Sequence, residues 1–96
     1  MSMDVYGQIA VKIIAGQEAI IGPVAIEQAQ RVSHLKVDWP KKEVEIDGAD
    51  NKVKVIEDLI NKYKELFGQI SVEVSKQAAA GLMAQLPADA LPAQLK

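Results

Sequence analysis

Apolar residues in the first part of the chain recur at intervals of three and four, which is the spacing of one helix face. The positions that form this pattern are Val5, Ile9, Ile13 and Ile20. Asp4 precedes them and is suited to cap the first turn. Gly22 and Pro23 follow, and these residue types commonly end one helix and open the next. We therefore predict a first helix over residues 4–20 and a second over about 23–33.

The pattern changes to strict alternation over residues 35–46. Before the turn Pro40-Lys41-Lys42, apolar side chains occupy every second position, and the same period returns after it; the positions are Leu35, Val37, Trp39, Val44 and Ile46. A period of two on both sides of a turn is typical of two half-buried strands. This segment is therefore predicted to be a β-hairpin.

Helical spacing returns after residue 52, and Asp50 is the expected cap of this third helix. The apolar stripe runs through Val53, Ile56, Leu59, Ile60, Tyr63, Leu66 and Phe67, and Gly68 then follows as Gly22 does in the first half. Residues 69–75 alternate locally and could form a strand. The helix-forming run 76–80 favours a fourth helix instead, which continues to about residue 85 before Pro87.

These elements predict a mainly helical α+β fold in the order ααββαα, with two helix–Gly–helix units flanking the hairpin. A shift of 46 residues aligns the two units: Gly22 meets Gly68, and apolar positions on both sides of the glycines coincide. One helix pair cannot bury its own apolar face, whereas two pairs packed about an approximate twofold axis can. The 96-residue length suits one compact domain over residues 1–86 and a Pro-containing tail over 87–96.

The segment Ile21-Gly22-Pro23-Val24-Ala25, and more loosely Phe67-Gly68-Gln69-Ile70-Ser71, resembles the Gly-Pro-Ile-Ala corner of small helical domains attached to bacterial and archaeal signalling proteins. The resemblance covers about five residues in each half, and the second copy lacks the proline. It implies a role in regulation or interaction rather than in catalysis. It carries over no binding residue.

The amino-acid composition argues against several classes of function. There is no cysteine, which excludes disulfides and cysteine-ligated zinc, and the net charge of −2 favours neither nucleic acid nor an anionic membrane. Lysines near the hairpin are interleaved with acidic residues, and no apolar run approaches the roughly 20 residues that span a bilayer. We expect a cytoplasmic protein that binds neither nucleic acid nor membrane.

Charged residues are concentrated in the middle of the chain: residues 34–76 hold 17 of the 24. Weakly charged ends in a small domain have two interpretations: these segments form the core, or they also supply a surface that is covered by a partner. On the second interpretation we expect a homo-oligomer or a complex with another protein. The candidate interface residues are Val5, Ile9, Ile13, Ile20, Trp39, Leu82, Met83 and Leu86. The alternative is a small-ligand sensor with an apolar pocket between the helix pairs, lined by Ile13, Ile60 and Tyr63.

Few residues are candidates for chemistry. Glu27 and Glu73 occupy matching repeat positions and could form a carboxylate pair, although ordinary helical ion pairs with Arg31 and Lys76 are the preferred interpretation. His34 is the single histidine, and a position at a helix end or simple exposure accounts for it. Trp39 could anchor a partner but is expected to cap the core.

The cluster of Asp47, Asp50 and Asn51 does not follow the EF-hand spacing and is interpreted as a turn with a helix cap. No serine lies in a nucleophile-elbow pattern, and no glycine-rich phosphate loop is present. We therefore expect no enzymatic activity, no cofactor and no metal.

Overall fold

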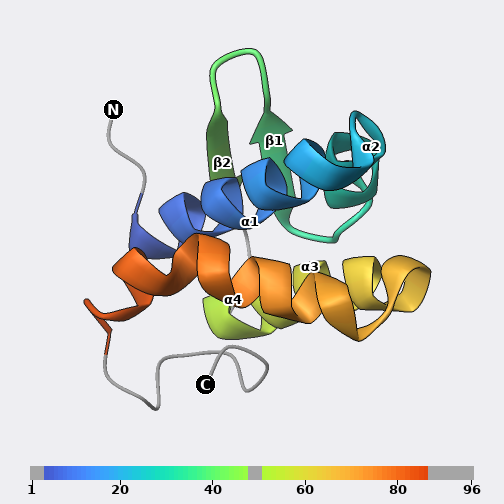
Figure 1. Ribbon diagram of the computed structural model, residues 1–96. Helices are drawn as coiled ribbons and strands as arrows, with labels where there is room; N and C mark the ends of the chain where they lie inside the picture. The colour runs from blue at the N-terminus through green and yellow to red at the C-terminus, as the bar shows by residue number, and fades with distance from the viewer. Residues whose placement is uncertain (1–3, 48–50, 87–96) are drawn as a thin grey trace.

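The computed structural model describes residues 4–47 and 51–86 and confirms the predicted order ααββαα (Figure 1). Within these residues it contains four helices and one two-stranded antiparallel sheet. The elements are α1 (Val5–Ile21), α2 (Val24–Gln30), β1 (Leu35–Asp38), β2 (Glu43–Ile46), α3 (Lys52–Phe67) and α4 (Gln69–Met83). The predicted tail, residues 87–96, lies outside the described residues.

Side-chain caps fix the starts of α1 and α3, the long helices that open the first and the second half of the chain. The Asp4 carboxylate accepts a hydrogen bond from the backbone N–H of Gly7 at 2.8 Å, as the sequence predicted. At α3 the cap is Asn51, which accepts from the N–H of Lys54 at 3.3 Å. The predicted cap, Asp50, is outside the described residues. Both halves thus begin their first helix with the same device.

The two glycine corners have the same backbone geometry. Gly22 has φ 73° and ψ −154°, and Gly68 has φ 79° and ψ −165°. Both φ values are positive, which glycine adopts without steric cost. Each glycine N–H also bonds to the carbonyl four residues before it, Glu18 at 2.9 Å and Lys64 at 2.8 Å. This equivalence supports the internal repeat inferred from the 46-residue shift.

The second helix is shorter than predicted. It ends at Gln30 rather than near residue 33, because the N–H groups of Arg31 and Val32 bond to carbonyls only three residues back, both at 3.1 Å. These tighter turns lead into His34, whose φ of 69° directs the chain into β1. The segment 69–75, for which a strand remained open, is helical.

Helix α1 occupies the middle of the molecule, with the hairpin on one side and the α3–α4 pair on the other (Figure 1). Its close approach to α4 depends on Gly16, where an added Cβ would lie 3.0 Å from the Cβ of Ala78. The core is built mostly from aliphatic residues, as the scarcity of aromatics predicts. Its fully buried large side chains include Ile9, Ile13, Ile14, Ile56, Leu59, Ile60 and Tyr63.

Candidate interaction surface

Five large apolar side chains within the described residues are exposed, and all five lie within two residues of a corner glycine. They are Ile20, Val24, Leu66, Phe67 and Ile70, with exposed fractions between 37% and 69%. We call this set the corner patch. Scattered exposed hydrophobics are ordinary, but a gathering at two equivalent corners is informative because large apolar patches often mark binding sites.

Buried hydrogen bonds hold the two corners at the same end of the molecule. The Gln17 side chain is 2% exposed, and its amide donates to the Ser71 carbonyl at 2.8 Å and the Ser75 hydroxyl at 3.1 Å. The Tyr63 hydroxyl donates to the Ala25 carbonyl at 2.6 Å. These bonds join the end of α1 and the start of α2 to α4 and α3. Figure 1 accordingly shows both corners on the side where α2 lies.

Charge is absent from the backbone segments that carry the patch. Neither residues 19–26 nor residues 66–72 contain an acidic or basic side chain. The five residues, spread over the two corners, together leave on the order of 400 Å² of apolar surface in solvent; for comparison, the largest contiguous patch on a typical monomer is roughly 300–600 Å². The corner patch is therefore large enough to be a contact surface, and no charge on its own segments opposes apolar contact.

The structure places only one of the predicted interface residues, Ile20, in this patch. Ile9 and Ile13, also predicted for the interface, are fully buried in the core and expose no surface to a partner in this structure. Trp39 is 9% exposed and lies against α1, where its indole N–H donates to Glu18 at 3.0 Å and the Lys42 ammonium lies 4.1 Å from the ring centroid.

The other four predicted residues are partly buried against the core: Val5, Leu82, Met83 and Leu86. Sequence reasoning missed four members of the patch, namely Val24, Leu66, Phe67 and Ile70. A signal was available, because these residues flank the two repeated glycines, where one helix ends and the next begins.

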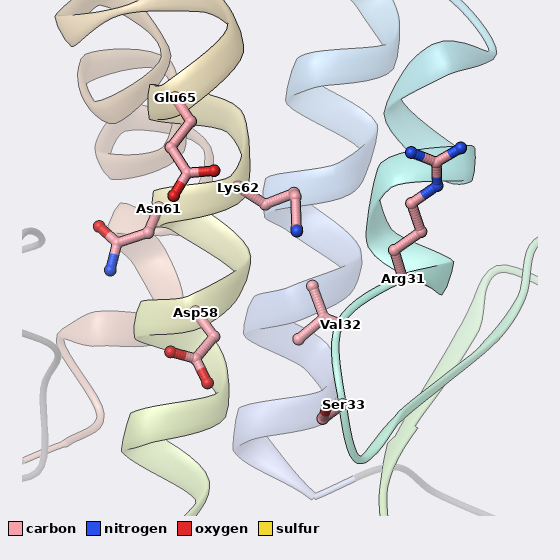
Figure 2. A pocket seen from close by; sticks show the side chains of 7 residues that line it. All are labelled: Arg31, Val32, Ser33, Asp58, Asn61, Lys62 and Glu65. Carbon is pink, nitrogen blue, oxygen red and sulfur yellow. The ribbon is translucent and has the colours of Figure 1, made fainter.

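A groove of about 290 Å³ lies between the segment that follows α2 and the middle of α3 (Figure 2). The α2 side contributes Arg31, Val32 and Ser33. Val32 is a buried residue, so the apolar part of the groove is small and the lining is mainly polar.

The α3 side of the groove is formed by Asp58, Asn61, Lys62 and Glu65. Figure 2 shows the Lys62 side chain extending from α3 toward the segment that carries Arg31. The groove lies between the two helix pairs, where an apolar pocket was the alternative expectation. The residues expected to line that pocket, Ile13, Ile60 and Tyr63, are instead fully buried core residues.

The predicted candidates for chemistry are dispersed over the surface. Glu27 and Glu73 are both exposed, and neither forms the predicted helical ion pair. His34 is exposed, and its Nδ1 lies 3.0 Å from the Asp47 carbonyl oxygen. Among the described residues, no group of three or more His, Cys, Asp or Glu side chains is arranged to hold a metal ion.

Comparison with known proteins gives no significant match to a protein-family model, a curated protein or a solved structure. The resemblance to helical signalling domains thus stays a prediction from the two corners. In the part of the chain that the structure describes, no helix is both long and apolar enough to cross a membrane.

Proposed function

We propose that this chain is a non-catalytic interaction module that self-associates, with the corner patch buried against the same patch of a second copy. The observation that carries the proposal is the gathering of five exposed apolar residues at one end of the molecule. Burial of apolar surface contributes roughly 25 cal/mol per Å², so burial of these five side chains would favour association.

A second copy suits the patch because the patch is self-complementary in chemistry. Its two segments carry no charge themselves, and the charges next to them are the glutamates that bound each segment, Glu18, Glu27, Glu65 and Glu73. The centre of the patch is therefore free of like-charge repulsion between copies. The patch is also built from repeat-equivalent positions: Ile20 corresponds to Leu66, and Val24 to Ile70. Contact about a twofold axis is the commonest arrangement of homo-oligomers, and it uses the same patch on both copies.

The size of the patch sets the strength of the contact. Two patches of about 400 Å² bury about 800 Å² in total, below the roughly 1,200 Å² of standard interfaces. We therefore expect a weak, reversible dimer with a Kd between about 10 μM and 1 mM rather than an obligate one. A regulatory module that responds to local concentration requires an affinity of this kind.

Sedimentation equilibrium of the native chain and of Ile70→Glu tests the proposal. Ile70 is 69% exposed, so its burial in both copies is worth about 2–4 kcal/mol, and the variant should weaken the dimer roughly 30- to 1,000-fold. The substitution should not harm folding, because Ile70 is the second residue of α4 and a glutamate there is favoured by the helix dipole.

Gln77→Glu is the matched control, since it adds the same charge at an exposed position on the same helix but outside the corner patch. We expect this variant to dimerise like the native chain. A native chain that stays monomeric to about 1 mM would refute the proposal. Equal dimerisation of the native chain and Ile70→Glu would show that another surface is used.

A further inference from the structure

Arg31 and Lys62 are the two cations that line the groove. Neither forms an ion pair with any residue in the ranges 4–47 and 51–86, which is also true of Lys12, Lys41, Lys64 and Lys76 on other parts of the surface. What distinguishes Arg31 and Lys62 is that they line the same groove. Suitable partners are present at helical spacing, since Glu27 lies four residues before Arg31 and Glu65 three residues after Lys62. The groove thus presents two positive charges whose hydrogen-bond donors are available.

Negative charge is also available in the groove. Glu65 is exposed and forms no ion pair with a described residue, while Asp58 contacts Lys54 at 3.5 Å. In Figure 2 the side chains of Asp58 and Glu65 both lie on the α3 side, with Lys62 between them along the helix. A polyanion such as a phosphate ester would be attracted by Arg31 and Lys62 but repelled by these carboxylates. The presence of cations and carboxylates in one groove favours a ligand that carries both a positive and a negative charge.

We propose that this groove binds a small zwitterion of the amino-acid class. The ligand carboxylate lies between the Arg31 guanidinium and the Lys62 ammonium, and the ligand ammonium faces Glu65. Guanidinium and ammonium groups form short, charge-assisted hydrogen bonds with carboxylates. The volume of about 290 Å³ is at the lower limit of small-molecule pockets and fits a single amino acid rather than a large cofactor.

The groove is open to solvent and its charged groups are screened, so the expected affinity is modest, with a Kd of about 1 mM. Binding should weaken as ionic strength rises, because the contacts are between exposed charges. The site is separate from the corner patch, and the inference does not depend on self-association.

Titration of the ¹⁵N-labelled chain with L-alanine, L-leucine and L-glutamine, followed by amide chemical shifts, tests the inference. Propionate and ethylamine are the matched probes, since each lacks one of the two charged groups of L-alanine. We expect saturable shifts for residues 31–33 and 58–65 with at least one amino acid by about 20 mM, and shifts at least about tenfold weaker with propionate or ethylamine.

Lys62→Met keeps most of the aliphatic stem but removes the charge, and it should weaken binding about tenfold or more. Lys76→Met removes a charge from an exposed position on α4 and should leave binding unchanged. The inference is overturned if none of the three amino acids shifts these amides, if propionate does so equally well, or if Lys62→Met binds like the native chain. Repeating the titration on Ile70→Glu separates this result from self-association, since the groove should bind equally in that variant.

Discussion

Tyr63 offers the sharpest test of how the two halves are joined, because it links α3 to the start of α2. Its side chain is fully buried, and its hydroxyl donates to the Ala25 carbonyl at 2.6 Å. Tyr63→Phe keeps the ring in place and removes only the donor. The loss of one net hydrogen bond, with a buried carbonyl left short of a partner, should cost about 1–2 kcal/mol of unfolding free energy.

Denaturant unfolding of the native chain and of Tyr63→Phe measures this cost. For a domain of this size, 1–2 kcal/mol corresponds to a fall of roughly 5–15 °C in Tm. The slope of the unfolding free energy against denaturant should be unchanged, because the folded surface is the same. If the two proteins unfold at the same denaturant concentration, the Tyr63 hydroxyl does not contribute to the joining of the halves.

Tyr63→Phe should also change how the unfolding free energy depends on pH in the alkaline range. Burial raises the pKa of Tyr63 well above its usual value, so the folded chain holds the neutral phenol. In the unfolded chain tyrosine ionises near pH 10. The stabilisation is therefore complete below about pH 10 and is lost as pH rises toward the folded pKa, by up to about 1.4 kcal/mol per pH unit. The stability advantage of the native chain over Tyr63→Phe should shrink above pH 10; an unchanged difference would contradict the burial of an ionisable hydroxyl.

Two further predictions concern the cap of α1 and the docking of the hairpin. Asp4→Ala should lower the unfolding free energy by about 1 kcal/mol and Asp4→Asn by less, because asparagine retains the capping oxygen. Burial alone would raise the Asp4 pKa, but hydrogen bonds from Lys52 and the Gly7 amide outweigh it and lower the pKa. The contribution of Asp4 to the unfolding free energy should therefore be present above about pH 4 and lost on acidification. Unfolding of the native chain and both variants over a series of acidic pH values measures this loss. Trp39→Phe removes the indole N–H that donates to Glu18 and part of a buried ring, and should cost about 2 kcal/mol in denaturant unfolding; a cost near zero would mean that the hairpin does not depend on this contact.

The order of elements was predictable because each change in apolar period coincided with a change in structure. The ambiguity over residues 69–75 shows where local pattern fails. Ile70, Val72 and Val74 would share one face of a strand, but in α4 they are exposed, buried and half-buried respectively. Alternation in the sequence alone does not distinguish a strand from a helix over this segment. The helix depends on the packing of α4 against α1 through Gly16 and Ala78. The early end of α2 was likewise not visible, because it depends on the local turns that lead to His34.

The candidate surface was predicted less well than the fold, and the reason is physical. Low charge in the first helix is compatible both with a core segment and with a surface covered by a partner, and the second interpretation led to Ile9 and Ile13. Low charge alone does not distinguish the two. In the structure α1 is central, so contacts with the hairpin on one side and with α4 on the other leave few positions that need charge.

The exposed large apolar side chains lie at the corners instead. Within α1, the exposed large apolar side chain is Ile20, which lies two residues before Gly22 at the end of the helix. The repeat places Leu66 in the equivalent position beside Gly68. The two corners lie on the same side of the molecule, and each leaves an apolar helix end exposed (Figure 1). The surface that we propose for a partner therefore follows the two glycines that turn the chain, not the density of charge along it.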